Sequence, residues 1–392
     1  MLTIETASRE FEAAVHSLAA PSSGNGRGIV ICGGGVKYFV CAWVCINRLR
    51  SLGCQLPIEL WHLGPVEMDA DMRALMEPLN VRCIDAFEIR RRHPARILNG
   101  WELKPFAIIH SAFHEALMLD ADNVPVVEPS FLFETPEYLR HRAVFWPDYG
   151  RLGPERSIWQ LTGVPYRDEP EFETGQILVD KRVCWQALRL TMWMNEHSDF
   201  WYQHIYGDKE TFHMAWRKLE LAYAMPSRGI ESLADTMCQH DFNGRRIFQH
   251  RNCAKWSLDH GNQMIPGFVD EDLCLGHLAD LRRLWARRPT RSFDYHVADE
   301  DERVIADNLC IGRWVMEEST NERYSIRFGL DGRIVQDASA SDIRWNLERD
   351  GATVLLRFVE AEGATCKLVQ LDDNHWKGRR QPGNCGQLLL SR

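Results

Sequence analysis

Hydrophobic positions follow two different periods along the chain. Up to about residue 285, short apolar runs alternate with segments whose apolar residues recur every three or four positions. This is the pattern of strands alternating with helices, and it favours a mainly parallel sheet covered by helices. Beyond about residue 293 the period becomes two, which is typical of antiparallel strands. The sequence therefore predicts an α/β domain followed by a small antiparallel β domain.

The period change and two composition breaks predict three segments. An amphipathic helix that would bury Phe11 and Leu18 precedes the flexible run PSSGNG. A second break, near residues 286–292, separates the two larger parts. The predicted segments are an N-terminal helix with its linker at 1–26, an α/β domain at 27–285, and a β-sandwich or barrel at 293–392.

Within the α/β domain, the run GIVIC predicts a buried strand at residues 28–32, followed by a tight turn of three glycines and a helix. A later strand is expected to end at Asp120 and Asp122. The polar segment 151–175 is too long for a simple connection, so we expect a functional or disordered loop there.

The composition indicates which classes of partner the protein is expected to bind and in which cellular compartment it is expected. The formal charge of -9 argues against a nucleic-acid groove, which needs an excess of lysine and arginine. Most of the twelve cysteines lie in apolar runs, so we expect reduced core thiols. The sequence shows neither a secretory signal nor an apolar run of membrane-spanning length. We therefore expect a cytoplasmic protein without a transmembrane segment, and peripheral membrane association stays open.

The stretch LDADN presents two carboxylates at a strand end, where charge is costly unless a cation is bound. Alternate residues of a strand point to the same side, so Asp120 and Asp122 can converge on one divalent ion. An ion such as Mn²⁺ or Mg²⁺ would bridge the phosphates of a nucleotide-sugar. The alternative is that the segment only forms a turn or caps a helix.

Further motifs, which occur in a fixed order along the chain, favour the metal-site interpretation over the turn or cap. The segment 98–123 resembles the donor site of GT-A glycosyltransferases, a Rossmann-like nucleotide-sugar fold, with Lys104 sixteen residues before Asp120. Together with GIVICGGGVKYF, FETGQILVDKR, GDKETF and FQHRNCAKW, it makes the chain similar to the fungal Golgi α-mannosyltransferases of the MNN1/MNN2-like group. These are relatives of the retaining, glycogenin-like glycosyltransferases. The resemblance covers roughly residues 26–260, and because this chain begins without the anchor of those enzymes, we do not expect their Golgi location to transfer.

The resemblance implies a ligand set for the metal and contacts for the nucleotide. Asp120, Asp122 and His250 would bind Mn²⁺ or Mg²⁺, and Asp120 would also face the donor. Lys255 would bind the diphosphate as a point charge. The remaining implied donor contacts are the backbone of Gly33, Gly34 and Gly35, the ring of Tyr38, which would stack on the base, and Lys104, which would reach the sugar or phosphate.

The resemblance also implies a retaining transfer and residues near the reacting sugar. Glu173 and Gln176 would flank the sugar, and Asp208 and Lys209 would bind donor hydroxyls or position the acceptor. A covalent glycosyl-enzyme on Glu173 and same-face attack without one both stay open. For Asp208, capping of the helix that follows is the structural alternative.

We therefore expect a metal-dependent hexosyltransferase, with mannose from GDP-mannose as the expected donor sugar and a carbohydrate or glycoconjugate hydroxyl as acceptor. A UDP-hexose donor is the alternative within this class. Two other classes stay open: an NAD(P)-dependent Rossmann oxidoreductase, suggested by the glycines and by Glu59, and a non-catalytic carbohydrate-binding protein that uses the β domain. The acceptor, the linkage and a homodimer are left undecided.

Two weaker patterns complete the candidates. The basic segment 90–96 would hold an anion or form a solvated face. Several tryptophans, among them Trp101, Trp146, Trp159 and Trp201, would stack on sugars or fill the core.

Overall fold

The chain folds into two units, Met1–Arg287 and Arg288–Arg392. The computed structural model describes residues 2–16, 24–258, 261–285, 300–310, 313–318, 323–328, 333–336, 339–350, 353–359, 365–381 and 387–392. The predicted break at 286–292 lies outside these residues. The predicted fold class, an α/β domain followed by a small antiparallel β domain, is confirmed by the sheets described below.

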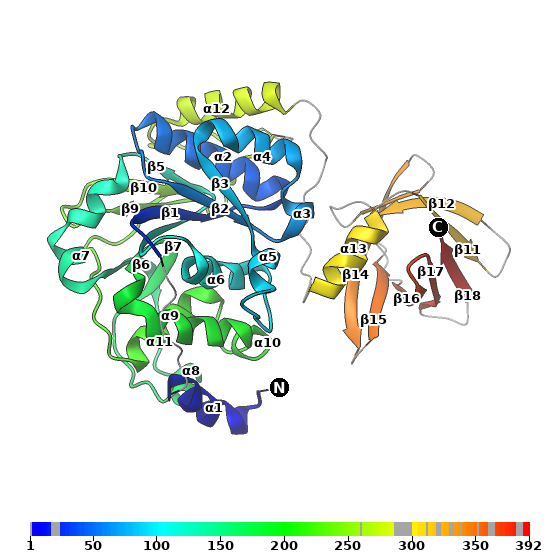
Figure 1. The fold of residues 1–392 in the computed structure, drawn as a ribbon, viewed down its shortest axis with the longest axis horizontal. Helices are drawn as coiled ribbons and strands as arrows, with labels where there is room; N and C mark the ends of the chain where they lie inside the picture. The colour runs from blue at the N-terminus through cyan, green and yellow to red at the C-terminus, as the bar shows by residue number, and fades with distance from the viewer. Residues whose placement is uncertain are drawn as a thin grey trace. The chain divides into compact units, whose positions relative to one another are not determined.

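A six-stranded sheet forms the centre of the first unit, in the order β3-β2-β1-β4-β7-β6 (Figure 1). The first four strands in this order run parallel, and β7 is antiparallel to both β4 and β6. The apolar run at 28–32 forms β1 as predicted. The strands are β1 (Arg27–Cys32), β2 (Ile58–His62), β3 (Val81–Asp85), β4 (Glu115–Asp120), β6 (Ala143–Arg151) and β7 (Pro170–Asp180).

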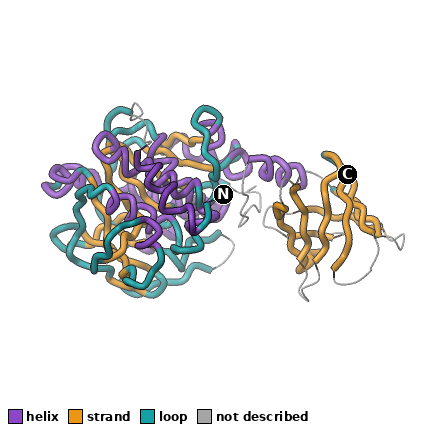
Figure 2. Tube along the Cα trace, turned by 90° about the horizontal axis from the view of Figure 1, so that it is seen from below, coloured by secondary structure: helices purple, strands orange, loops and turns teal. Residues whose placement is uncertain are grey.

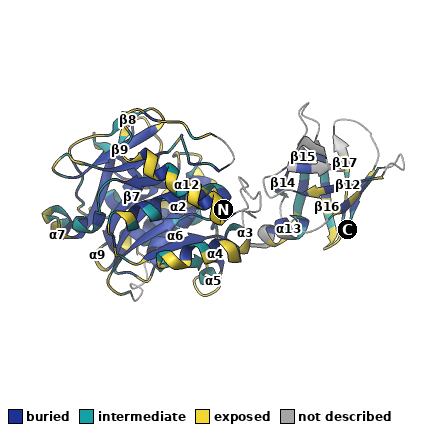
Figure 3. Ribbon diagram, turned by 90° about the horizontal axis from the view of Figure 1, so that it is seen from above, coloured by how far each residue is buried: buried dark blue, intermediate teal, exposed yellow. Residues whose placement is uncertain are grey.

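Helices cover both faces of this sheet, so its strands are buried on both sides (Figures 2 and 3). Alternate residues of β1 enter different cores, with Val30 in one and Ile31 in the other. One face is covered by α2 (Gly35–Ser51), α4 (Ala70–Met76) and α12 (Glu271–Leu284), the other by α6 (Leu103–His110), α9 (Lys181–Glu196) and α11 (Asp208–Lys218). The shorter helices are α3 (Gly64–Glu67), α5 (Ala86–Arg90), α7 (Pro136–His141), α8 (Ile158–Thr162), α10 (Ser198–Trp201), η1 (Glu77–Leu79), η2 (Gly100–Glu102) and η3 (Pro129–Glu134).

A second, smaller sheet of the same unit has the order β5-β10-β9-β8. Its strands are antiparallel, and β5 begins three residues after the end of β4. It therefore starts at the edge where the main sheet ends its parallel strands. The strands are β5 (Asn123–Pro125), β8 (Glu231–Leu233), β9 (Thr236–His240) and β10 (Arg246–His250).

The predicted N-terminal helix is present as α1 (Ile4–His16), and it belongs to the first unit. Its Phe11 is fully buried, with ring centroids 5.9 Å from Trp193 and 5.8 Å from Trp201. Leu18 lies outside the described residues.

The expectation of a long irregular loop at 151–175 is wrong. The segment contains α8, and β7 already begins at Pro170. Apolar side chains anchor it, because Ile158 is fully buried and Trp159 nearly so. The polar residues on either side of these two positions obscured the short helix in the sequence, and the helix is stabilised by tertiary packing.

The second unit contains a closed antiparallel barrel in which each strand pairs with the next and β18 pairs with β11 (Figure 1). Among the strands described for this unit, closure leaves none with an unpaired edge. Helix α13 (Glu300–Cys310) precedes the barrel. The strands are β11 (Trp314–Glu318), β12 (Arg323–Phe328), β13 (Arg333–Gln336), β14 (Ser339–Asp350), β15 (Thr353–Val359), β16 (Thr365–Asp372), β17 (His375–Gln381) and β18 (Gln387–Ser391).

Side chains at alternate positions fill the barrel, which is why this part of the sequence has a period of two. Trp314 and Met316 of β11 are buried, whereas Val315 between them is exposed. The Trp314 indole also donates a hydrogen bond to the carbonyl of Leu309, the residue before the last of α13, at 2.8 Å. The helix is thereby fixed to the first strand.

Most of the described cysteines are buried, which is the core placement expected from their apolar runs. Each described cysteine is free, and Cys41 and Cys45 are fully buried core residues. No helix in the described residues combines the length and apolarity that crossing a membrane requires.

The buried carboxyl of Glu102, at the end of η2, makes stability depend on pH. Burial raises the pKa of Glu102 to about 7. Between pH 4.5 and 7 the unfolded chain therefore releases a proton that the folded chain keeps, so the free energy of unfolding falls as the pH rises through this window. We expect Glu102→Gln to remove this loss and to be more stable than the wild type by up to about 3 kcal/mol above pH 7.

Urea unfolding at pH 4.5 and pH 8 measures this difference. The exposed Glu155→Gln is the control, for which we expect no change at either pH. An equal effect of Glu102→Gln at both pH values would contradict the assignment.

Candidate metal and donor site

Asp120 and Asp122 lie at the carboxyl end of β4. Asp120 is the last residue of the strand, and Asp122 lies in the turn before β5. Parallel pairing of β1 with β4 places Asp120 beside Cys32, at the start of the glycine turn. The Asp122 side chain is 4% exposed. The segment forms a turn, which was the alternative to a metal site. Its two carboxylates nevertheless also lie close to one common side chain.

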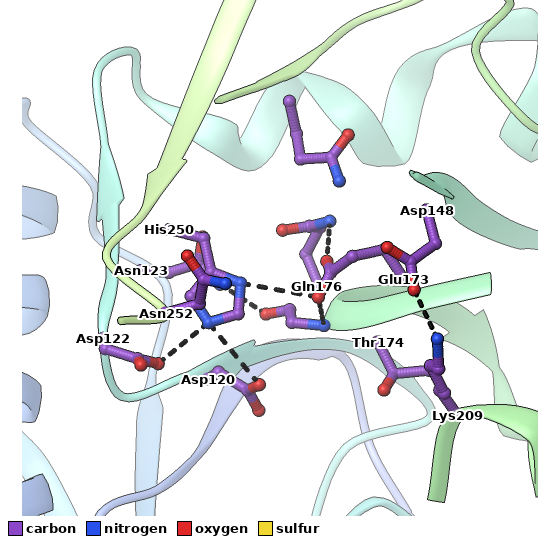
Figure 4. Close-up of polar contacts among 12 residues, drawn as sticks. Asp120, Asp122, Asn123, Asp148, Glu173, Thr174, Gln176, Lys209, His250 and Asn252 are labelled. Carbon is purple, nitrogen blue, oxygen red and sulfur yellow. Dashed lines mark hydrogen bonds and ion pairs between the residues drawn. The ribbon is translucent and has the colours of Figure 1, made fainter. Parts of the chain in front are cut away.

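That shared partner is His250, at the end of β10. Antiparallel pairing with β5 puts His250 opposite Asn123, the residue after Asp122. The His250 Nε2 atom lies 3.1 Å from Asp122 Oδ1 and 3.9 Å from Asp120 Oδ2 (Figure 4). One ligand atom from each of the three residues falls within 4.8 Å of the others. The structure therefore brings the predicted metal ligands together.

Lys104 joins this cluster from α6. Its Nζ lies 3.0 Å from Asp120 Oδ1 and 3.1 Å from Asp208 Oδ2, and it donates to the carbonyl of Thr174 at 3.0 Å. Asp208 is the first residue of α11, and Gly207 occupies the capping position. The alternative that Asp208 caps the helix is therefore wrong, because its carboxylate is engaged by Lys104 and by the hydroxyl of Thr174.

Lys255 approaches from the opposite end of the acidic pair. Its ammonium forms an ion pair with Asp122 and donates to the carbonyl of Asn252 at 2.9 Å. The same Nζ lies 5.8 Å from the centroid of the Tyr38 ring, which is 40% exposed. Lys255 and Tyr38 are thus close enough to contact one ligand.

The glycine turn is explained in part by packing within the chain. A Cβ atom at Gly34 would lie 2.3 Å from a carboxylate oxygen of Glu67, and one at Gly33 would lie 2.8 Å from Leu60. Gly35 has a φ of 70°, which favours glycine. The contact of this turn with a nucleotide stays a prediction.

Glu173 and Gln176 are buried within β7, and their observed partners are protein groups. Glu173 Oε1 accepts from the Gly175 amide at 2.9 Å and lies 3.4 Å from His250 Nδ1. Glu173 Oε2 accepts from the Gln176 amide nitrogen at 2.6 Å. Glu173 therefore faces the side of the imidazole that is turned away from the aspartates (Figure 4).

Lys209 lies on the far side of Glu173 from Asp120 and Asp122 (Figure 4). Its Nζ is 2.6 Å from a carboxylate oxygen of Asp148 and 2.6 Å from one of Glu171. Burial lowers the pKa of Lys209, but hydrogen bonds to these two acids outweigh it and raise the pKa above its usual value. Lys209 is therefore a fixed cation.

Acidic groups outnumber the lysines at the cluster. With a neutral imidazole, the cluster carries two negative charges in excess, from Asp120, Asp122, Glu173 and Asp208 against Lys104 and Lys255. Burial lowers the pKa of His250, but the charge of Asp122 and the hydrogen bond to it hold that pKa well above its usual value. A divalent cation would supply the missing charge, and its binding would displace the proton of His250.

These residues fit a divalent metal by their chemistry. Two carboxylates and one imidazole suit Mn²⁺, and Mg²⁺ accepts the same oxygens. The orientation of His250 fits as well, because a metal-binding histidine usually directs its other ring nitrogen to a carboxylate, and His250 Nδ1 lies 3.4 Å from Glu173 Oε1.

Two neighbouring residues escaped the sequence interpretation. A Cβ atom at Gly175 would lie 2.6 Å from His250 Nδ1, so only glycine lets the ring reach the aspartates. The Asn123 side chain donates to the Gly175 carbonyl. At this site, Asn123 Oδ1, Gln176 Oε1 and His250 Nδ1 belong to the buried atoms of the described residues that have no hydrogen-bond partner. Neither Asn123 nor Gly175 stood out in the sequence, because each lies in a motif whose other residues were the candidates.

The remaining candidates are tied to the protein itself. Glu59 is buried inside β2 and pairs with Arg82, so it does not stand at the strand end that a dinucleotide ribose requires. In the basic segment, Arg96 pairs with Asp199 and Arg91 with Glu88. Three of the four candidate tryptophans, Trp146, Trp159 and Trp201, are buried, and Trp101 is 49% exposed.

Residues 26–163 match the model of a family described as "Mannosyltransferase putative". Alpha-1,2-mannosyltransferase MNN24 of Candida albicans is 28% identical over 265 residues, covering 56% of this chain and 37% of that protein. Alpha-1,2-mannosyltransferase MNN2 of Saccharomyces cerevisiae is 26% identical over 273 residues, covering 55% and 46%. The chain thus spans less than half the length of these curated relatives.

Two solved structures also align with the chain at 14% identity. Mouse xyloside xylosyltransferase 1 aligns with a TM-score of 0.35, over 52% of this chain and 85% of that one. The galactosyltransferase LgtC aligns with a TM-score of 0.37, over 50% and 73%. The resemblance to fungal α-mannosyltransferases that the motifs indicated is confirmed by the sequence matches, and residues 26–163 are similar to a mannosyltransferase family.

Proposed function

We propose that the first unit is a metal-dependent, retaining glycosyltransferase of the GT-A type that transfers mannose from GDP-mannose to a hydroxyl of a carbohydrate or glycoconjugate. The observation that carries the proposal is the convergence of Asp120, Asp122 and His250, three buried or half-buried ligands from two distant parts of the chain. The choice of mannose is supported by the relatives, which are named alpha-1,2-mannosyltransferases.

In this proposal Asp120, Asp122 and His250 hold Mn²⁺ or Mg²⁺, which would neutralise charge on the departing diphosphate. Lys255 binds the diphosphate from the side of Asp122, and Tyr38 beside it stacks on the base. Such fixed charges stabilise a transition state because they need no reorganisation during the reaction.

Lys104 and the residues around it would orient the donor sugar. Lys104 holds Asp120 and Asp208 at fixed positions, so that Asp208 can accept from a sugar hydroxyl. The unpartnered oxygens of Asn123 and Gln176 offer two further acceptors, since a buried carbonyl without a donor is unfavourable. Orientation by several hydrogen bonds lowers the entropic cost of reaching the reactive geometry.

Glu173 acts in this proposal as a positioning residue. Its carboxylate is bound to the Gly175 amide and to Gln176 and faces His250 Nδ1, so it would fix the ring with Nε2 toward the metal. This arrangement supports same-face attack more than a covalent glycosyl-enzyme on Glu173, because a nucleophile needs a free carboxylate oxygen directed at the sugar.

Metal-dependent turnover tests the main proposal. We expect Asp120→Asn and His250→Ala each to lower Mn²⁺-dependent hydrolysis of GDP-mannose by on the order of 100-fold or more, because each removes a ligand. Nucleotide release is measured with and without chelator. The exposed Asp71→Asn should retain wild-type activity.

Undiminished activity of either variant under excess chelator would contradict metal dependence. The donor is tested in the same assay with a panel of UDP-hexoses. Turnover of a UDP-hexose in preference to GDP-mannose would contradict the donor assignment while leaving the metal site intact.

Metal affinity separates the positioning role of Glu173 from direct action on the sugar. We expect Glu173→Gln to weaken Mn²⁺ binding by about 10- to 100-fold, because the amide no longer holds the imidazole. Binding of Mn²⁺ alone is followed by electron paramagnetic resonance, with exposed Glu155→Gln as the matched control. Unchanged Mn²⁺ affinity together with lost turnover would instead assign Glu173 to the sugar.

A further inference from the structure

Two aromatic side chains remain exposed beside the proposed site. Trp101, in η2, is 49% exposed, and Tyr206, just before α11, is 76% exposed. Their ring centroids are 6.1 Å apart and the ring planes differ by 32°. Large aromatic surfaces are usually buried, so two exposed rings in contact with each other are informative.

The pair is attached to the two segments that carry site residues. Trp101 precedes Lys104 by three positions, and Tyr206 precedes Asp208 by two. A Cβ atom at Gly207 would lie 2.9 Å from the Trp101 ring, which therefore packs directly on the start of α11. Because Lys104 and Asp208 are ion-paired, the two segments that carry the aromatic pair are joined next to the proposed metal ligands.

Lys209 connects the pair to a pocket of about 410 Å³. Its Nζ lies 5.9 Å from the Tyr206 ring centroid, and it binds Asp148, which lines the pocket. Tyr149, 60% exposed, lines it as well. Glu171, the second partner of Lys209, is two residues from Glu173 in β7, which places it about 7 Å along the strand on the same side.

We propose that Trp101, Tyr206 and the Asp148–Lys209–Glu171 cluster form the acceptor subsite, which binds a saccharide by stacking and by hydrogen bonds to its hydroxyls. The inference rests on the proposed function. Pyranose rings carry apolar C–H faces that pack on aromatic rings, and carboxylates are strong acceptors for hydroxyl donors. The subsite therefore matches a neutral, hydroxyl-rich ligand and places it next to the reacting sugar.

Acceptor kinetics test the subsite. With saturating GDP-mannose and Mn²⁺, we expect Trp101→Ala and Tyr206→Ala each to raise the KM for methyl α-D-mannopyranoside or an α-linked mannotriose by about 10-fold. Trp101→Phe and Tyr206→Phe, which keep a ring, should stay within about 2-fold of the wild type. Hydrolysis of the donor by water should be unchanged in all four variants.

Two comparisons keep the result independent of folding. Tyr206 is the more exposed residue, so its truncation tests the subsite even if Trp101→Ala loses stability. Leu273→Ala, at a 53% exposed position of α12, is the surface control and should leave the acceptor KM unchanged. An unchanged acceptor KM in Tyr206→Ala, or a donor KM that rises equally, would overturn the assignment.

Direct binding separates failure of the subsite from failure of the proposed function. Saturation-transfer NMR with methyl glycosides of mannose, galactose, glucose and xylose needs no turnover. Saccharide binding that is lost in Tyr206→Ala supports the subsite, even if GDP-mannose is not a donor. Absence of binding by all four glycosides to the wild type would overturn it, even if donor hydrolysis is observed.

Discussion

Pairing of β5 with β10 is the constraint on which the candidate site depends. The two strands are short, yet their register places His250 opposite Asn123 and therefore beside Asp122. These residues are separated by more than 120 positions in the chain. A shift of one residue in this register would turn the imidazole to the other face of the small sheet. The backbone ladder thus determines whether the three ligands meet.

The main sheet supplies the other half of the geometry. The β1–β4 pairing aligns Asp120 with the glycine turn, and the antiparallel β7 brings Gly175 under the imidazole. Burying this many carboxylates without cations would be unfavourable. The ion pairs with Lys104 and Lys255 offset only part of this desolvation free energy. A further positive charge at this cluster would offset the rest of that cost.

The sequence predicted the fold class, and it singled out Asp120, Asp122 and His250, which the structure brings together, because strong local signals marked them. Apolar runs ending in LDADN located Asp120 and Asp122, and the order of motifs suggested His250. The partners of Glu173 and Lys209 could not be predicted, since they depend on how β7 faces β10 and β6 and no local pattern encodes it. The expectation of a loop at 151–175 was wrong for a related reason, because Ile158 belongs to a core made of residues distant in sequence.

Closure of the barrel through β18 has a consequence for the integrity of the second unit. The pairing of Gln387–Ser391 with β11 and β17 satisfies the backbone donors and acceptors of both neighbours. A proteolytic cut that removed these few residues would open the barrel and leave β11 and β17 with unpaired backbone amides and carbonyls. Unpaired strand edges pair with strands of other molecules. Loss of a few C-terminal residues would therefore favour intermolecular association of the second unit.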